Sequence, residues 1–227
     1  MNERKTEDMV EHRLRNHGYY TPDSEIVVEK QQSDITRINK LLANASKSGS
    51  GGGKPEFIIH SSRESEFIIV VECKADPTKH ESDTKTRYKD YAVDGVLLYA
   101  SFLSKEFNVL AIAVSGQDED SFRISHHLHL QKTENPVEWD VSHDIVSFDE
   151  YYDAFNTSDI KFRQDYHILL QYSRKLSGYL KKNKIMESKR ALLISGILIA
   201  LKNKAFCQSY RSCSAYAYLD HNFAKLR

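Results

Sequence analysis

Two acids and a lysine near the middle of the chain could together carry out chemistry. Glu56 directly follows Pro55, and Glu72 comes sixteen positions later, two residues before Lys74. Mg²⁺ prefers oxygen ligands and usually takes one or two carboxylates, with water and a substrate phosphate completing its octahedron. A lysine beside such an ion can orient a water molecule or balance negative charge developing on phosphorus. These residue types predict metal-dependent hydrolysis of a phosphodiester.

The elements around these residues must bring them to one place. Glu56 opens one apolar segment of strand length and Glu72 closes the next, with a polar turn between the two segments. A hairpin of this kind would place both carboxylates at the same end of a sheet. Strand alternation puts Lys74 on the same face as Glu72 and turns the Cys73 side chain into the core. The backbone carbonyl of Cys73 remains a candidate metal ligand.

The same residues have a structural explanation that must be weighed. Glu and Lys are common at strand ends, because the sheet stops there and water begins, so a Glu-X-Lys motif alone is weak. Pro55-Glu56 at the start of the preceding strand and Val70-Val71 immediately before Glu72 strengthen the catalytic interpretation. We therefore expect Glu56, Glu72 and Lys74 to form an active site.

The rest of the chain predicts an α/β fold with a mixed sheet followed by helices. Apolar periodicity predicts helices and strands in the order helix, helix, hairpin, helix, strand, strand. The expected helices are 5–17, 34–45 and 86–105, and the expected strands are 55–60, 66–73, 108–115 and 122–130, with 25–30 a short strand or helical turn. Later segments, 148–156, 162–182 and 187–204, read as helices. We expect domains at 1–150 and 151–227, the second being a helical connector.

Composition limits the function classes further. Lys+Arg and Asp+Glu both number 32 among 227 residues, so no overall positive field attracts nucleic acid. The three cysteines, Cys73, Cys207 and Cys213, include no Cys-X-X-Cys pair, and the charged N-terminus lacks an apolar leader. These features predict a cytoplasmic protein. The apolar run 191–201 is too short to span a bilayer, so we expect it to be buried or to pack on a partner.

Several segments extend the Glu56/Glu72/Lys74 motif into a family resemblance. Pro55-Glu56 followed by Glu72-Cys73-Lys74 resembles the PD-(D/E)XK nuclease superfamily, with Glu replacing the usual Asp of the first motif. The similarity covers LLANASKSGSGGGKPEFII, VVECKADPTKHES, YAVDGVLLYASFLSKEFNVLAIAVSG and SKRALLISGILIALKNKAF. Together these segments resemble the N-terminal nuclease domain, and part of the helical connector, of type IIG and type I-like restriction-modification enzymes.

The resemblance implies a restriction-endonuclease-like core and an Mg²⁺-dependent DNA endonuclease, with Mn²⁺ as a possible substitute. It implies double-stranded DNA as substrate, an N6-adenine methyltransferase and specificity domain as partners, and transient dimerisation on DNA. It also assigns an extra acid to the first helix, where Glu7 lies nearer than Glu11 to the Val10/Leu14 stripe. An acid stabilising the helix N-terminus is the alternative role for Glu7.

Three further residues are candidate DNA contacts. Lys47 and Lys54 flank a glycine-rich stretch that could approach phosphates beside the site, or could be a plain linker. Tyr91 lies on the predicted helix after Lys74, where related nucleases can carry a residue that contacts DNA. Because Tyr91 also belongs to an apolar helical repeat, a buried core tyrosine is the alternative.

What the sequence lacks limits its activity. No NPPY-like methylation segment and no glycine-rich S-adenosylmethionine loop appear, so we expect this chain neither to methylate DNA nor to read a specific sequence. It reads as the cleavage and connector portion of a larger enzyme. Two other functions stay open: a non-catalytic, nuclease-like module that docks a methyltransferase or specificity partner, and a structure-directed repair nuclease.

Overall fold

The computed structural model describes residues 2–22, 24–47 and 51–203. Cys207, Cys213 and the last residue of the predicted helix 187–204 lie outside these ranges. The chain divides into two compact units, Met1–Gln164 and Asp165–Arg227. The sheet and the predicted active-site residues belong to the first unit.

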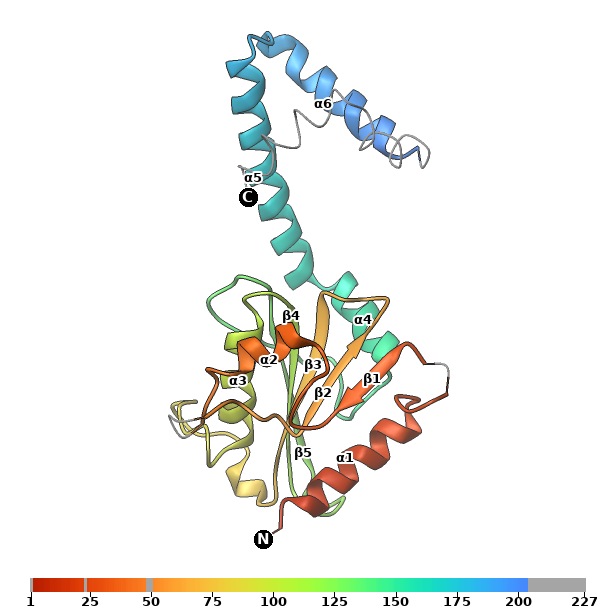
Figure 1. The fold of residues 1–227 in the computed structure, drawn as a ribbon, viewed down its shortest axis with the longest axis vertical. Coiled ribbons are helices and arrows are strands. Elements are labelled where there is room, and N and C mark those ends of the chain that lie inside the picture. The colour runs from red at the N-terminus through yellow and green to blue at the C-terminus, as the bar shows by residue number, and fades with distance from the viewer. Residues whose placement is uncertain (1, 23, 48–50, 204–227) are drawn as a thin grey trace. The chain divides into compact units, whose positions relative to one another are not determined.

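A six-stranded mixed sheet forms the centre of the first unit (Figure 1). Its strands follow the chain order, and β3 and β4 are parallel whereas every other neighbouring pair is antiparallel. The strands are β1 (Ile26–Glu29), β2 (Phe57–Ser61), β3 (Phe67–Lys74), β4 (Asn108–Ser115), β5 (Arg123–His129) and β6 (Val137–Glu138). Every residue of β3 and β4 is buried, as their continuous apolar sequences predict for strands covered on both faces.

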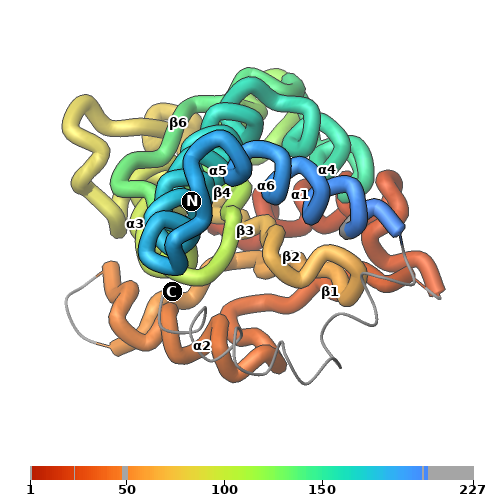
Figure 2. Tube along the Cα trace, turned by 90° about the horizontal axis from the view of Figure 1, so that it is seen from above, coloured from red at the N-terminus to blue at the C-terminus, as the bar shows by residue number. Residues whose placement is uncertain are grey.

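Helices cover both faces of the sheet (Figure 2). One face packs against α1 (Arg4–Asn16) and α4 (Phe148–Thr157), and the other against α2 (Thr36–Leu42) and α3 (Ala92–Leu103). Alternate residues of β3 supply the two cores, so Cys73 joins the α1 side while Val70 joins the α3 side. The predicted α/β class with a mixed, helix-flanked sheet is confirmed.

Helix α4 belongs to the first unit. Ser147 and Glu150 form a reciprocal capping box that starts this helix, and Tyr151 and Phe155 are buried in the core. The Phe155 ring stacks on Phe67 of β3 with centroids 4.9 Å apart. The compact unit therefore continues beyond residue 150, where we predicted the domain to end, as far as Gln164.

Helix α3 begins later than its sequence suggests. We predicted a helix from residue 86, but α3 starts at Ala92, after a short 3₁₀ turn η1 (Pro77–Lys79) and a loop. The buried Asp94 carboxylate explains the difference. It accepts hydrogen bonds from the backbone N–H of Ser82, the Ser82 hydroxyl and the backbone N–H of Arg87, and so holds the preceding segment as a loop.

The second unit is helical over the residues that the structure describes. It contains most of α5 (Asp159–Lys182) and all of α6 (Glu187–Leu201). The predicted helix 162–182 is confirmed, and the predicted helix 187–204 is confirmed as far as Leu201. Several large apolar side chains of α6 are exposed among the described residues, which contradicts burial of this run and leaves packing on a partner as the expectation: Leu192, Leu193, Ile197, Leu198 and Ile199. No helix in the described ranges is long and apolar enough to cross a membrane.

Candidate active site

Glu72 near the end of β3 is the centre of the candidate site. Its side chain is fully buried, and Oε1 accepts contacts from two lysines, with Lys74 Nζ at 3.2 Å and Lys47 Nζ closer still. The second oxygen, Oε2, has no hydrogen-bond partner among the described residues. Burying an ionised carboxylate oxygen without a partner is costly, so Oε2 is the atom of Glu72 whose lone pairs are open to a cation or a donor.

Glu56 is held beside Glu72 by the backbone. Its N–H donates to the Val71 carbonyl at 3.1 Å, which fixes Glu56 immediately before β2 and next to the end of β3. Burial and then the negative charge of Glu72 raise the pKa of Glu56 to about 8, while Lys47 and Lys74 act in the opposite direction. Two carboxylates close enough to perturb each other in this way are the arrangement that a divalent cation relieves.

Burial is also the main cause of the raised pKa of Glu72. The lysine charges of Lys47 and Lys74 oppose that rise and favour the carboxylate form. The ionisation of the buried Glu72 carboxyl group therefore depends on the two lysines beside it.

Lys74 completes the predicted motif. Its Nζ lies 3.2 Å from Glu72 Oε1 and donates to Glu3 Oε1 at 2.9 Å. Burial alone would lower the pKa of Lys74, but Glu72 and Glu3 together raise it above its ordinary value. Lys74 is therefore a fixed cation between two acids.

The N-terminus of α1 is anchored at this end of the sheet. The Thr6 hydroxyl is fully buried and donates to the Gly116 carbonyl at 2.8 Å, with the Lys74 carbonyl at 3.4 Å. This attachment brings Glu3 onto Lys74. Glu7, the acid that we predicted from α1, also raises the pKa of Glu56 through its negative charge, but by less than Glu72 does. Glu3, which the sequence did not single out, makes the direct contact.

Cys73 has the orientation expected from strand alternation. Its side chain lies in the α1 core, and burial raises the pKa of its thiol well above the ordinary value. The neighbouring Lys74 carbonyl accepts a hydrogen bond from Gly116 N at 3.1 Å, toward β4. Since successive carbonyls of a strand point to opposite edges, the Cys73 carbonyl faces the β2 edge, beside Glu56.

The donor set suits a hard divalent cation. Glu56 and Glu72 supply two carboxylates and Cys73 a backbone carbonyl, which matches the few protein ligands that Mg²⁺ takes. Within residues 2–22, 24–47 and 51–203, no group of three or more His, Cys, Asp or Glu side chains could hold a metal.

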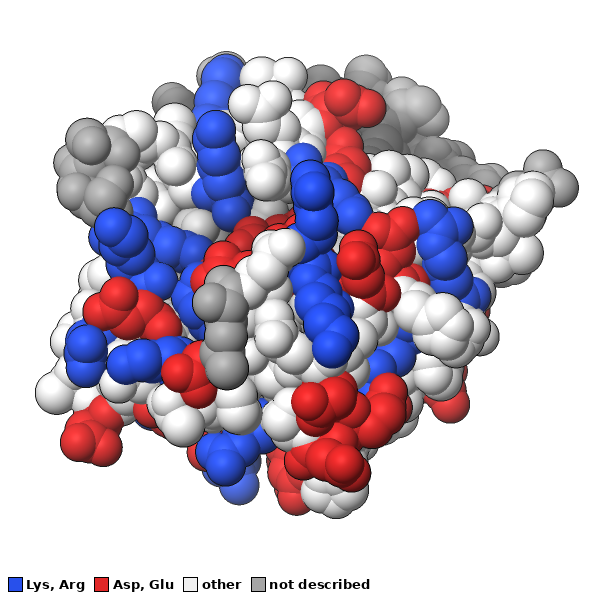
Figure 3. Space-filling model, turned by 90° about the horizontal axis from the view of Figure 1, so that it is seen from below, with Lys and Arg blue, Asp and Glu red and all other residues white. Residues whose placement is uncertain are grey.

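Lysine and arginine side chains stand around acidic side chains on the face at the N-terminal end of α1 (Figure 3). A shallow hollow of about 230 Å³ adjoins Lys74 and Glu3 and is also lined by two lysines, Lys79 and Lys89, and by two acids, Asp76 and Asp90. Lys79 and Lys89 are the groups of this hollow that could contact phosphates of a nucleic-acid strand.

The three predicted DNA contacts have different surroundings. Tyr91 caps α3, and its ring lies under Lys79 and Arg87, at 4.9 and 4.8 Å from the ring centre. Because Tyr91 is only partly buried and belongs to neither core cluster, the alternative of a core tyrosine is wrong. The Lys54 side chain is exposed. Lys47, by contrast, turns inward onto Glu72.

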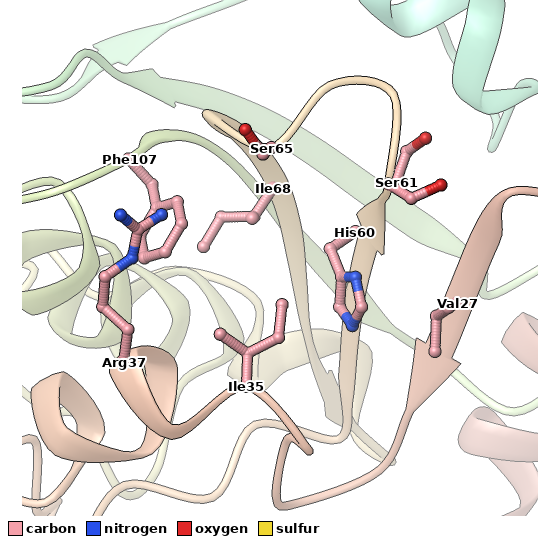
Figure 4. A pocket seen from close by; sticks show the side chains of 9 residues that line it. Val27, Ile35, Arg37, His60, Ser61, Ser65, Ile68 and Phe107 are labelled. Carbon is pink, nitrogen blue, oxygen red and sulfur yellow. The ribbon is translucent and has the colours of Figure 1, made fainter.

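A larger hollow, of about 360 Å³, lies at the opposite end of β2 and β3 (Figure 4). Val27, Ile35, Ile68 and Phe107 contribute apolar side chains, and the Arg37 guanidinium stacks 4.2 Å from the Phe107 ring centre. None of the predicted site residues lines this hollow. The predicted site residues lie instead at the end of β3 that carries Glu72.

Comparison with known proteins supports a restriction-modification relationship. The chain is 29% identical over 210 residues to the type II restriction enzyme and methyltransferase RM.BcgI of Heyndrickxia coagulans. The alignment covers 82% of this chain and 32% of that protein, so the chain spans about a third of its relative's length. No family model and no solved structure matches the chain.

Proposed function

We propose that this chain is the metal-dependent DNA endonuclease part of a restriction-modification enzyme, of the PD-(D/E)XK type. The observation that carries the proposal is the buried Glu72 carboxylate, which has one free oxygen, a second carboxylate beside it and Lys74 at 3.2 Å. The similarity to a restriction enzyme and methyltransferase supports DNA as the substrate.

Glu56, Glu72 and the Cys73 carbonyl would hold Mg²⁺, or Mn²⁺ in its place. When bound, the ion would supply Lewis-acid activation of the phosphodiester and of the attacking water. Lys74 is already a cation fixed at the carboxylates, where it can orient that water and balance charge developing on phosphorus. Lys79 and Lys89 would hold flanking phosphates in the adjoining hollow.

Sequence choice and methylation would come from other parts of the enzyme. The relative is named as both a restriction enzyme and a methyltransferase, and it is about three times as long as the matched region. We therefore propose an N6-adenine methyltransferase and a specificity domain as partners, within the same protein or associated with it. Cutting both DNA strands with one carboxylate site per chain requires two copies, so transient dimerisation on DNA follows.

A plasmid assay tests the proposal. Wild type and Lys74→Ala are incubated with supercoiled plasmid and Mg²⁺ or Mn²⁺, alone and with the adenine methyltransferase and specificity partner. We expect wild type to nick or linearise the plasmid and Lys74→Ala to do neither. Equal nicking by both proteins, or no cleavage under any condition, would contradict a catalytic role.

The exposed apolar side chains of α6 favour a second candidate, a non-catalytic module that docks a methyltransferase or specificity partner. The neutral net charge agrees with such a role. In the plasmid assay this module would bind its partner but never cleave. Cleavage that appears when the partner is added would instead support a nuclease that depends on docking.

A further inference from the structure

Lys47 occupies an unusual place for a residue between a helix and a strand. It follows α2 in the sequence, yet its Nζ contacts Oε1 of Glu72, twenty-five residues further on. Only 18% of the Lys47 side chain is exposed, and the carboxylate it meets is fully buried. A surface lysine beside a nucleic-acid path would keep its ammonium in water instead.

Residues of α3 lie against the Lys47 side chain. Its Nζ lies 5.0 Å from the centre of the Tyr99 ring, within the range of a cation–π contact. Gly95, one helical turn before Tyr99, leaves room for the ion pair. A Cβ atom on Gly95 would lie 3.2 Å from Lys47 Cε and 3.3 Å from Glu72 Cγ. The absence of a side chain at Gly95 therefore accommodates both partners.

Two described positions near Lys47 in the sequence, Ala45 and Gly53, are also held in place. Ala45 is buried and its N–H donates to the Leu42 carbonyl at 2.9 Å, while Gly53 N–H donates to the same carbonyl at 2.7 Å. A Cβ atom on Gly53 would lie 2.6 Å from the Ala45 carbonyl oxygen, so only glycine permits this close return of the chain. Lys47 thus follows closely on a fixed position, Ala45, from which its side chain reaches Glu72.

Charge balance indicates what this lysine does. A buried carboxylate needs a counter-ion, and Lys74 is shared between Glu72 and Glu3. A divalent ion bound through the unpartnered Oε2 of Glu72 would lie close to the Lys47 ammonium on Oε1 and repel it. Lys74 lies in β3 and is also held by Glu3, whereas Lys47 lies outside the sheet, so its long side chain is the one that can turn away.

We infer that Lys47 is the counter-ion of Glu72 in the metal-free protein and leaves the carboxylate when a divalent ion binds. This inference rests on the proposed function, since it presumes that Glu56 and Glu72 bind a metal. It adds that metal binding competes with a lysine of the protein itself. Once released, the Lys47 ammonium becomes available to a DNA phosphate at the site.

Calcium titration tests the inference without cleavage. The Ca²⁺ affinity of the purified chain is measured by calorimetry for wild type, Lys47→Met and Lys105→Met. Methionine keeps an unbranched apolar stem over Tyr99 but removes the charge, and Lys105 is an exposed lysine after α3, toward the other end of the sheet. We expect Lys47→Met to bind Ca²⁺ about three- to tenfold more tightly than wild type, from the loss of a nearby positive charge. Lys105→Met should match wild type.

Thermal unfolding provides a second readout. Without metal, Lys47→Met should melt below wild type and Lys105→Met, because Glu72 loses a buried partner. Saturating Ca²⁺ should raise its melting temperature by more than it raises that of wild type. If Lys47→Met does not fold, Lys47→Gln replaces it, since an amide can still donate to Glu72.

The outcomes separate the two proposals. Equal or weaker Ca²⁺ binding by the Lys47 variant, with normal binding by wild type, would overturn the role of Lys47 and leave the metal site standing. Wild type that binds no Ca²⁺ would overturn the metal site itself, together with the inference built on it.

Discussion

The Nζ atom of Lys74 lies 3.2 Å from Oε1 of Glu72, and both side chains leave β3 on the side that faces α3. The same lysine reaches Glu3 at 2.9 Å, so it links the sheet to the residue that precedes α1. A cation fixed in this way needs no reorganisation to meet charge that develops beside it.

The first prediction separates the chemical role of Lys74 from metal binding. Lys74→Ala should lower the cleavage rate by about a hundredfold or more, the usual cost of losing one stabilising charge. Its Ca²⁺ affinity should not fall, because no metal ligand is removed. Plasmid cleavage and calorimetry measure the two effects. A variant that loses Ca²⁺ binding as well would assign Lys74 to building the metal site.

The second prediction concerns the pH dependence of metal binding. With its pKa raised to about 8 by burial and by Glu72, Glu56 carries a proton at neutral pH, and a metal must displace that proton. Ca²⁺ affinity should therefore rise with pH, by about tenfold per unit for one released proton, and level off above about pH 8. Three other charged groups also act on the pKa of Glu56: Lys47 and Lys74 lower it, and Glu7 raises it.

Calorimetric titrations between pH 6 and pH 9 measure this slope. Glu56→Gln cannot take up the proton, so its weaker Ca²⁺ binding should vary less with pH. A wild-type affinity that does not change over this range would contradict the linkage.

The third prediction concerns stability in acid. Burial lowers the pKa of His126 to about 4, with a smaller contribution from His127, and His126 Nε2 lies 2.7 Å from the Tyr151 hydroxyl. Between pH 4 and 6.5 the unfolded chain takes up a proton that the folded protein does not. The contribution of His126 to stability is therefore present above pH 6.5 and is lost as the pH falls toward 4.

Urea unfolding of wild type and His126→Gln at several pH values measures this loss. Because every other titrating group is common to both proteins, the wild-type free energy of unfolding should fall more steeply, by up to about 1.4 kcal/mol per pH unit. Glutamine retains a donor and an acceptor for Tyr151. Parallel curves for the two proteins would contradict the prediction.

The fourth prediction uses two helical glycines. Gly→Ala inside a helix ordinarily stabilises by about 0.5–1 kcal/mol. At Gly95 the new Cβ would lie 2.9 Å from the Tyr88 carbonyl oxygen as well as against Lys47 and Glu72, so Gly95→Ala should destabilise by about 1–3 kcal/mol. Gly178→Ala in α5 has nothing within 4 Å and should stabilise. Thermal unfolding measures both, and stabilisation by Gly95→Ala would show that α3 can move away from the pair.

Much of the sheet was predictable because its strands are buried on both faces. The apolar run of β4 has the bounds expected from sequence, Asn108–Ser115, and β3 extends one residue past its predicted end. The start of α3 was not predictable, because the tyrosines before it repeat at helical spacing. The buried Asp94 carboxylate of α3 accepts hydrogen bonds from backbone N–H groups of the loop before the helix. These hydrogen bonds depend on the folded arrangement and cannot be seen in the sequence.

Some residues of the candidate site were predictable from the sequence and others were not. Glu56, Glu72 and Lys74 are recognisable from motif spacing, and the structure brings these three together. The contacts of Glu3 and Lys47 cross many residues of sequence and carry no local signature. Gly95 offered one signal, since an isolated glycine within an apolar helical repeat often marks a close approach.

The ion pairs of the site also bear on its net charge. Before metal arrives, Lys47 and Lys74 offset Glu72 and Glu3, while Glu56, with a pKa of about 8, is mostly uncharged at neutral pH. A divalent ion that displaces one proton makes the charge of this end of the molecule more positive by one unit. DNA binding by the neutral chain should therefore be stronger when the ion is present, even when the ion is Ca²⁺.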